Sequence, residues 1–196
     1  MARTILLLRH GQHDEVGHVL SGRSEIVLNA PGIAQARAAA TLLAATRLAA
    51  IHSSPRMRCR QTADTIGAPV HVTPALDEIA FGAFTGRRFA ELDADPGWQR
   101  WNVERDTFRC PGGETMREAT DRALTFLIGL PNDDRTTLCV THCDIIRGLV
   151  VRALGLSFAR MFALPCDPGS ITRMTIDDSG LRLVTLNALP GQFADQ

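Results

Sequence analysis

The sequence predicts a three-layer α/β/α fold, in which a mainly parallel central sheet carries helices on both faces. Short apolar runs typical of buried strands alternate along the chain with longer segments of helical periodicity. The chain has 196 residues, of which 45% are hydrophobic and 21% are charged. This length and composition are sufficient for one soluble domain with a core of its own, so we expect residues 1–196 to form a single domain.

Strands are expected where short apolar or β-rich runs are bounded by turn residues. The first of these runs ends in Arg-His-Gly, and the last two flank Ser179-Gly180, which suits a hairpin turn. The six expected strands are at residues 3–8, 49–53, 69–72, 136–141, 170–176 and 181–187.

Helices are expected between these strands. Asn29 is a suitable N-cap and Pro31 suits a first turn. Glu114 and Glu118 are favourable near the N-terminal end of a later helix. The expected helices run from Asn29, from Ser54-Pro55 to about Gly67, over about 114–130 and over 144–154.

An irregular segment separates the third strand from the helix at about 114–130. It is rich in glycine and proline and contains both tryptophans, Trp98 and Trp101. We expect a helical insertion at about 82–113 that covers the site, with the tryptophans packed inside it.

Composition excludes several kinds of chemistry. All 21 basic residues are Arg, so no Lys is present to form a Schiff base or to complete a Gly-Lys-Ser/Thr phosphate loop. Tyr is also absent. The formal net charge is zero, which argues against nucleic acid or an anionic membrane as a general partner.

The cysteines and the N-terminal residues indicate the cellular compartment in which the protein is expected. The five Cys are odd in number, irregularly spaced and without a CxxC pair, which favours reduced thiols in a cytoplasmic protein. The apolar run at residues 5–8 is too short for a signal peptide or a membrane span.

Polar residues follow three of the predicted strands. In sheets of this kind the active site lies beyond the carboxyl ends of the strands, so we expect these residues to meet. Arg offers a fork of donors matched to phosphate oxygens, and His can act as a nucleophile. Gly allows close approach of the backbone, and amides at a helix N-terminus can face an anion. The three clusters are Arg9-His10-Gly11, Ser53-Ser54 and His142-Cys143.

Five sequence blocks extend over roughly residues 3–150, and in chain order they are LLLRHG, SSPRMRCRQTA, LDEIAFGAFTG, PGGET and VTHCDIIRGLV. With these blocks in this order, the chain resembles the histidine phosphatase superfamily, which includes cofactor-dependent phosphoglycerate mutases, the fructose-2,6-bisphosphatase domain and α-ribazole phosphatase. The resemblance implies a phosphoglycerate mutase-like fold.

The resemblance also implies roles for individual residues. Arg9 and His10 match the RHG motif, which implies that His10 accepts the phosphoryl group. Arg58 matches a phosphate clamp, Glu78 a proton donor, and His142 a second histidine that contacts the transferring group. In the implied reaction neutral His10 attacks phosphorus in line, and preorganised donors replace a metal. Glu78 protonates the leaving oxygen and then activates water, so no cofactor is expected.

The chain departs from the superfamily pattern beside these motifs. Gln12-His13 replace the common Glu-Thr or Glu-Ser, and His13 is expected either to contact the substrate or to lie at the surface. Cys143 replaces the usual Gly and is expected to be a small residue packed near the site. Gly22 and Arg23 resemble a further block, in which Arg23 reaches the substrate or lies in a solvated loop.

The activity expected from these motifs is metal-independent hydrolysis of a phosphomonoester of a small phosphorylated metabolite. Phosphoglycerate mutases are the alternative within the family, but they have a longer segment between the acid and the second His, and this chain lacks their Lys and Tyr. A non-catalytic domain that binds phosphorylated ligands is the alternative from another class. The natural substrate and the oligomeric state stay open, with a homodimer as one option.

Two other phosphatase chemistries fit less well. A cysteine-dependent phosphatase needs Arg after Cys and five further residues, and none of the five Cys has it. A metallophosphatase would draw on His10, His13, Asp14 and His18, but it needs more carboxylates at strand ends than the sequence offers, so we expect no metal site.

Overall fold

The structure is a computed structural model that describes residues 2–131 and 135–189. In these residues a six-stranded sheet has the order β3-β2-β4-β1-β5-β6. Strands β3, β2, β4 and β1 are parallel, and β5 and β6 are antiparallel to their neighbours. The strands are β1 (Arg3–Arg9), β2 (Leu48–Ser53), β3 (Val70–Val72), β4 (Thr136–Thr141), β5 (Ile171–Asp177) and β6 (Gly180–Ala188).

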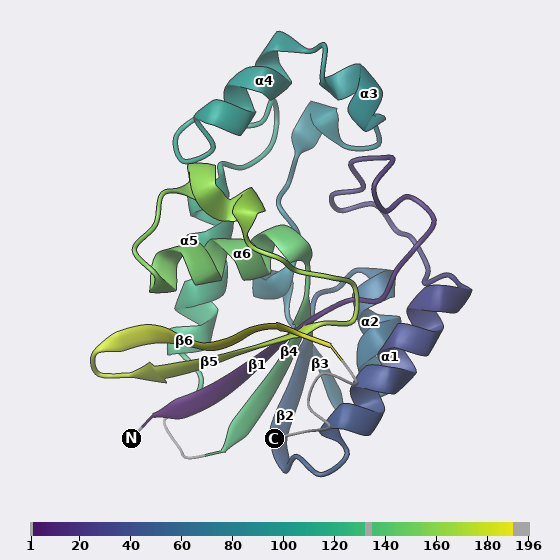
Figure 1. The fold of residues 1–196 in the computed structure, drawn as a ribbon, viewed down its shortest axis with the longest axis vertical. Coiled ribbons are helices and arrows are strands. Elements are labelled where there is room, and N and C mark those ends of the chain that lie inside the picture. Colours follow the sequence, from purple (N-terminus) through teal and green to yellow (C-terminus); the bar gives the residue numbers. More distant parts are fainter. Residues whose placement is uncertain (1, 132–134, 190–196) are drawn as a thin grey trace.

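Helices cover both faces of this sheet, which confirms the predicted three layers (Figure 1). One face packs against α1 and α2, and the other against α5 and α6. The α-helices are α1 (Ala30–Leu43), α2 (Met57–Asp64), α3 (Phe89–Leu92), α4 (Pro96–Val103), α5 (Met116–Ile128) and α6 (Cys143–Ala153). The 3-10 helices are η1 (Pro74–Leu76), η2 (Gly82–Phe84) and η3 (Phe158–Ala163).

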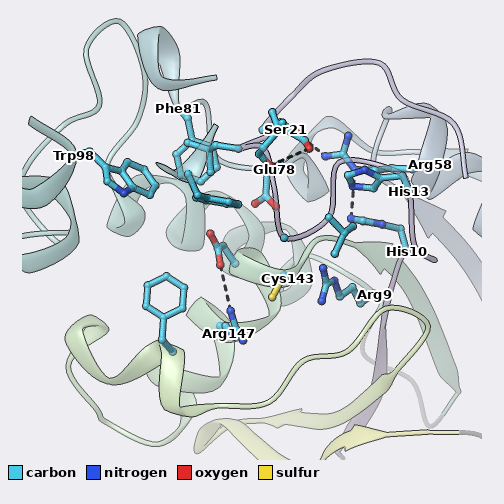
Figure 2. Close-up of a pocket in the computed structure, with 18 of the residues that line it drawn as sticks. Arg9, His10, His13, Ser21, Arg58, Glu78, Phe81, Trp98, Cys143 and Arg147 are labelled. Atoms are coloured by element: carbon cyan, nitrogen blue, oxygen red, sulfur yellow. Dashed lines mark hydrogen bonds and ion pairs between the residues drawn. The ribbon is translucent and has the colours of Figure 1, made fainter. Parts of the chain in front are cut away.

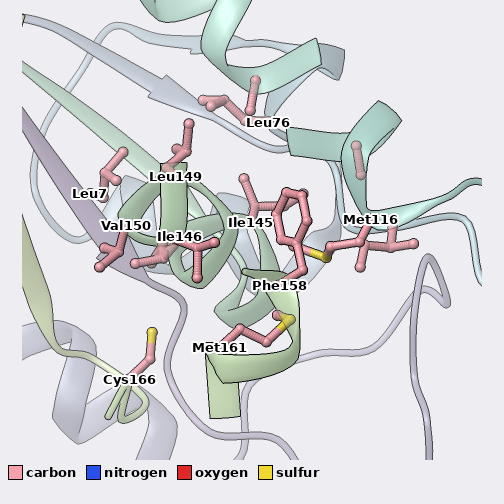
Figure 3. Packing of buried hydrophobic residues seen from close by; sticks show 14 of the residues in the cluster. Leu7, Leu76, Met116, Ile145, Ile146, Leu149, Val150, Phe158, Met161 and Cys166 are labelled. Atoms are coloured by element: carbon pink, nitrogen blue, oxygen red, sulfur yellow. The ribbon is translucent and has the colours of Figure 1, made fainter. Parts of the chain in front are cut away.

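The apolar run of β1 serves both faces of the sheet. Ile5 and Leu7 join the core beneath α5 and α6, while Leu6 and Leu8 join the core beneath α1 and α2. Strands buried on both sides have continuous apolar sequences for this reason. Figure 3 shows Leu7 within the larger of the two cores, near residues of α6 and η3. The strand is thereby fixed so that its carboxyl end delivers His10 to the site.

The predicted helix boundaries were wrong in two places. Helix α2 begins at Met57 and not at Ser54-Pro55, because the hydroxyl of Ser54 bonds to residues of the site and does not cap the helix. Helix α5 begins after Thr115, which forms a capping box with Glu118, so Glu118 lies in the first turn as predicted. Glu114 precedes this cap, and its carboxylate accepts hydrogen bonds from Arg23 and from the Ala80 amide.

Residues 82–113 contain η2, α3 and α4, which lie apart from the sheet at the top of Figure 1. Trp98 and Trp101 are buried and stacked with their ring centroids 5.2 Å apart, so they pack as expected. That the whole chain forms one domain stays a prediction. In the part of the chain that the structure describes, no helix is both long enough and apolar enough to span a membrane.

Candidate active site

His10 leaves β1 with its imidazole fixed and neutral. Its Nδ1 lies 2.8 Å from the carbonyl oxygen of Gly11, which makes Nδ1 the donor and leaves the lone pair on Nε2. Burial, the guanidinium of Arg58 and that of Arg9 hold the pKa of His10 well below its usual value of 6.5. The result is a deprotonated nitrogen that can attack an electrophile at neutral pH.

Arg58 connects the two strand-end histidines. It lies in the first turn of α2 and is 1% exposed. Its Nε donates to Nε2 of His10 at 3.3 Å, and its Nη2 lies 3.1 Å from Nδ1 of His142. The carbonyl oxygens of Gly22 and Ser24 accept from the same guanidinium at 2.5 and 2.9 Å. The guanidinium is therefore held from both sides in one orientation.

A relay behind Arg58 orients His142. Nε2 of His142 lies 2.8 Å from the Ser54 hydroxyl, which lies 3.2 Å from the Asp77 carboxylate. Because Ser54 has a single proton and donates it to Asp77, Nε2 of His142 donates to Ser54, and Nδ1 accepts from Arg58. Burial and Arg58 lower the pKa of His142, so this ring is also neutral.

Glu78 brings a carboxyl group to the same place. Its Oε2 lies 3.9 Å from Nδ1 of His142, and its Oε1 accepts from the Ile79 amide at 3.0 Å. Burial, together with the nearby charge of Asp144, raises the pKa of Glu78 well above its usual value of 4.5. A raised pKa favours the acid form of the carboxyl group, which can donate a proton.

These groups surround one cavity of about 200 Å³. Arg9, His10, Arg58 and Glu78 line it, and Figure 2 shows them converging from separate segments. Nη1 of Arg9 donates to the carbonyl oxygen of Cys166 at 2.5 Å. His142 is fully buried and does not line the cavity, although its ring centroid lies 5.2 Å from that of His10.

The weaker candidates divide into those that reach the cavity and those that do not. His13 is buried and lines it, with its ring centroid 5.4 Å from that of His10, and Gly22 and Cys143 also line it. Arg23 does not: its guanidinium contacts the carboxylate of Glu114 and the backbone of Glu78. Gly11 approaches a backbone closely, because a Cβ there would lie 2.3 Å from the carbonyl oxygen of a glycine in α1.

Sequence reasoning missed several functional neighbours. Ser54 was noted only as a strand-end residue, and Asp77 was not noted, although it directly precedes Glu78. Arg56 is a further such neighbour, because it forms an ion pair with Asp77 at 3.1 Å. Arg60, on the same helix as Arg58, is exposed. The one available signal for Asp77 was its position inside the LDE motif.

The described residues around the cavity do not form a metal centre. Across residues 2–131 and 135–189, no group of three or more His, Cys, Asp or Glu side chains is arranged to hold a metal ion. Fixed guanidiniums, neutral imidazoles and an acidic carboxyl group around one cavity suit a tetrahedral oxyanion such as a phosphoryl group. The fold and the site together suit an enzyme that acts on a phosphoryl group.

Comparison with known proteins gives the family. The model of the histidine phosphatase superfamily (branch 1) matches residues 5–189, and the chain belongs to this superfamily. The resemblance seen in the five sequence blocks is thereby confirmed.

Individual relatives agree with this family. The chain is 26% identical over 204 residues to a putative phosphoserine phosphatase 2 of Hydrogenobacter thermophilus, which covers 95% of this chain and 96% of that protein. It is 27% identical over 192 residues to the adenosylcobalamin/α-ribazole phosphatase of Salmonella typhimurium, covering 93% and 95% of the two chains. The solved structure of a mycobacterial glucosyl-3-phosphoglycerate phosphatase has a TM-score of 0.83 and 28% identity, with 96% and 100% covered.

Proposed function

We propose that this chain is a metal-independent phosphatase in which His10 transiently carries the phosphoryl group of a small phosphorylated metabolite. The observation that supports this most strongly is the neutral Nε2 of His10, 3.3 Å from the guanidinium of Arg58 on the wall of the cavity. A nucleophile and a phosphate-binding cation at this spacing can engage the same phosphoryl group.

The first step transfers the phosphoryl group to the enzyme. The bound phosphoryl group takes over the hydrogen bond that Arg58 Nε gives to Nε2 of His10. The freed Nε2 lone pair forms a bond to phosphorus while the bond from phosphorus to the leaving oxygen breaks. The guanidiniums of Arg9 and Arg58 donate to the nonbridging oxygens. Glu78 gives its proton to the leaving oxygen, so the product departs as a neutral alcohol. We give His142 the role of positioning Arg58, because its Nδ1 accepts from that guanidinium and its one N–H is used by Ser54.

The second step regenerates His10. The Glu78 carboxylate takes a proton from a water molecule, whose oxygen attacks phosphorus as the bond from phosphorus to His10 breaks. Inorganic phosphate leaves, and Glu78 is again in the acid form. The raised pKa of Glu78 supports both halves of this cycle, because the carboxyl group must gain and lose a proton near the working pH.

The remaining proposals are less central to the reaction. His13, Gly22 and Cys143 line the cavity, which supports a part in substrate binding. Arg23 positions Glu78, because the backbone carbonyl oxygen of Glu78 accepts a hydrogen bond from Nε of Arg23 at 2.8 Å. We also propose a cytoplasmic location, which is supported by five thiols that the described residues hold outside any disulfide.

The test is hydrolysis of p-nitrophenyl phosphate in the presence of a chelator. We expect full activity with EDTA and a loss of at least about 10³-fold in kcat for His10→Ala. The matched control is His71→Ala, because His71 is an exposed histidine on β3, outside the cavity. A chelator-sensitive activity, or a His10→Ala variant as active as His71→Ala, would overturn the proposal.

A further inference from the structure

Two cysteines from separate segments meet at the edge of the cavity. Cys143 is the first residue of α6, is partly exposed and lines the cavity, and in Figure 2 its sulfur lies near Arg9. Cys166 is 3% exposed and lies in the loop of residues 164–170, between η3 and β5. Sγ of Cys143 lies 3.8 Å from the carbonyl oxygen of Cys166, and the two thiols share a hydrogen bond. The sulfur atoms are therefore close enough to bond without unfolding of either segment.

The other three cysteines are placed differently. Cys59, Cys110 and Cys139 are fully buried and do not line the cavity, and burial raises the pKa of each thiol. A thiol that is buried in apolar surroundings and protonated is a poor nucleophile. Cys143 is thus the cysteine that a small molecule meets when it enters the cavity.

The surroundings of the pair stabilise a thiolate. The pKa of the Cys166 thiol is lowered by the hydrogen bond from Cys143 and by the positive charges of Arg9 and Arg147. Transfer of a proton along the hydrogen bond between the thiols passes the negative charge to Cys143. The sulfur that faces the cavity can thereby react as a thiolate, which is the form that attacks an oxidant.

The loop that carries Cys166 also holds Arg9. Nη1 of Arg9 donates to the carbonyl oxygen of Cys166 at 2.5 Å, and the Gly169 amide donates to the carbonyl oxygen of Arg9 at 3.1 Å. The sulfur atoms of a disulfide are only about 2 Å apart, so a bond between the two cysteines draws Cys166 toward α6. The carbonyl oxygen that fixes the Arg9 guanidinium moves with it.

We propose that Cys143 and Cys166 are an oxidisable pair, which hydrogen peroxide converts to a disulfide that slows turnover by displacing Arg9. Formation of the disulfide does not depend on the proposed function. Its effect on turnover does rest on that function, because Arg9 acts there as a donor to the phosphoryl oxygens.

The oxidation balances with hydrogen peroxide as the only oxidant. The pair first loses one proton to water, and the Cys143 thiolate attacks one oxygen of the peroxide as the O–O bond breaks. The departing hydroxide takes the proton of the Cys166 thiol and leaves as water. The Cys166 thiolate then attacks the sulfur of the Cys143 sulfenic acid, and the departing hydroxide recovers the first proton as a second water. Two thiols are oxidised to one disulfide while one peroxide is reduced to two waters.

The first measurement is mass spectrometry of peroxide-treated protein, with free thiols blocked by N-ethylmaleimide before digestion with trypsin. We expect a peptide that joins residues 136–147 to residues 161–173, with the link on Cys143 and not on Cys139. Cys166→Ala should lack this cross-link. Cys110→Ala is the matched control, a buried thiol outside the cavity, and should keep it. A wild-type protein without the cross-link, or with the link on Cys139, would overturn the proposal.

The second measurement is kcat/KM for p-nitrophenyl phosphate before and after peroxide treatment. We expect a fall of at least about tenfold in the cross-linked wild-type enzyme and recovery with dithiothreitol. Cys110→Ala should respond as the wild type does. An unchanged kcat/KM in cross-linked enzyme would contradict the displacement of Arg9, and so would an equal loss in Cys166→Ala. A reduced wild-type enzyme without activity would instead overturn the proposed function, and the effect on turnover with it, while the cross-link still forms.

Discussion

The Nε of Arg58 donates to Nε2 of His10 across 3.3 Å, although the two residues are 48 positions apart in the chain. Burial and this nearby positive charge both disfavour protonation of the imidazole, so the contact helps to keep the ring neutral while it places a phosphate ligand beside it. One arginine thereby contributes to the protonation state of the proposed nucleophile and to the position of the group that it attacks.

Replacement of Arg58 should reduce catalysis even when the positive charge is kept. We expect Arg58→Lys to lower kcat/KM by about 10²-fold, because an ammonium group cannot reproduce the fork that spans both histidines and the loop at Gly22. The exposed Arg60 on the same helix supplies the control, and Arg60→Lys should keep wild-type kinetics. Thermal unfolding measured beside the kinetics separates loss of function from loss of fold. Wild-type kinetics in Arg58→Lys would be incompatible with this role.

The pH dependence of kcat/KM should follow the opposite pKa shifts of His10 and Glu78. His10 must be neutral to attack, and its lowered pKa places the acid limb of kcat/KM below pH 6.5. Glu78 must be protonated to donate, and its raised pKa places the alkaline limb well above pH 4.5. Activity therefore lies between these limbs and falls on both sides of them. A profile that keeps rising with pH through the alkaline range would argue against Glu78 as the acid.

Substitution of Glu78 should depend on the leaving group. In Glu78→Gln, kcat/KM for ethyl phosphate should fall by about 10²-fold or more, since this leaving oxygen needs a proton. The loss for p-nitrophenyl phosphate should be smaller, because p-nitrophenolate departs readily without one. Glu91→Gln, at an exposed position on α3, is the control and should alter neither substrate. Equal losses on both substrates would contradict proton donation.

The buried His13 should make the protein sensitive to acid. Burial and the charges of Arg58 and Arg9 lower its pKa from 6.5 to about 4, so the unfolded chain binds a proton in this range before the folded chain does. The free energy of unfolding must then decrease as pH falls from 6.5 toward 4. In His13→Gln this decrease should be smaller, by on the order of 2 kcal/mol. Urea denaturation at pH 7 and pH 4.5 measures it, and identical pH dependence in both proteins would refute the burial of His13.

Gly11 should tolerate no side chain. A Cβ at this position would lie 2.3 Å from the backbone oxygen of Gly32, so β1 and α1 must separate for Ala to fit. We expect Gly11→Ala to destabilise the fold by about 2 kcal/mol and to displace His10 enough to lower kcat by about 10²-fold. Gly129→Ala is a fair comparison, since its Cβ would be no closer than 3.4 Å to its neighbours. A Gly11→Ala enzyme with wild-type stability would show that this contact is not tight.

Much of the fold and the centre of the site could be predicted from local sequence. Residues 5–8, which precede Arg9 and His10, are all apolar and indicate a buried strand. A parallel sheet brings the end of this strand beside the strand that precedes His142. The N-cap at Asn29 could also be predicted from local sequence, because its side chain accepts from the amide of Gly32, only three residues further along the chain.

Contacts between distant segments could not be predicted in this way. The relay from Asp77 through Ser54 to His142 depends on three segments that meet only in the folded chain. Helix η3, which brings Phe162 to the cavity, has only six residues, and its Ser157 cap alone does not distinguish a short helix from a turn. Arg56 and Arg58 are both arginines in one motif, and only the fold decides which of them faces His10.

The most direct test of the account is the position of the phosphoryl group during turnover. Enzyme mixed with ³²P-labelled substrate and quenched in alkali within milliseconds should carry an acid-labile, alkali-stable label that peptide mapping places on His10. The label should be absent from His10→Ala and present in His71→Ala. Label on any other residue, or rapid turnover in which no phosphoenzyme forms, would contradict the claim that His10 is the nucleophile.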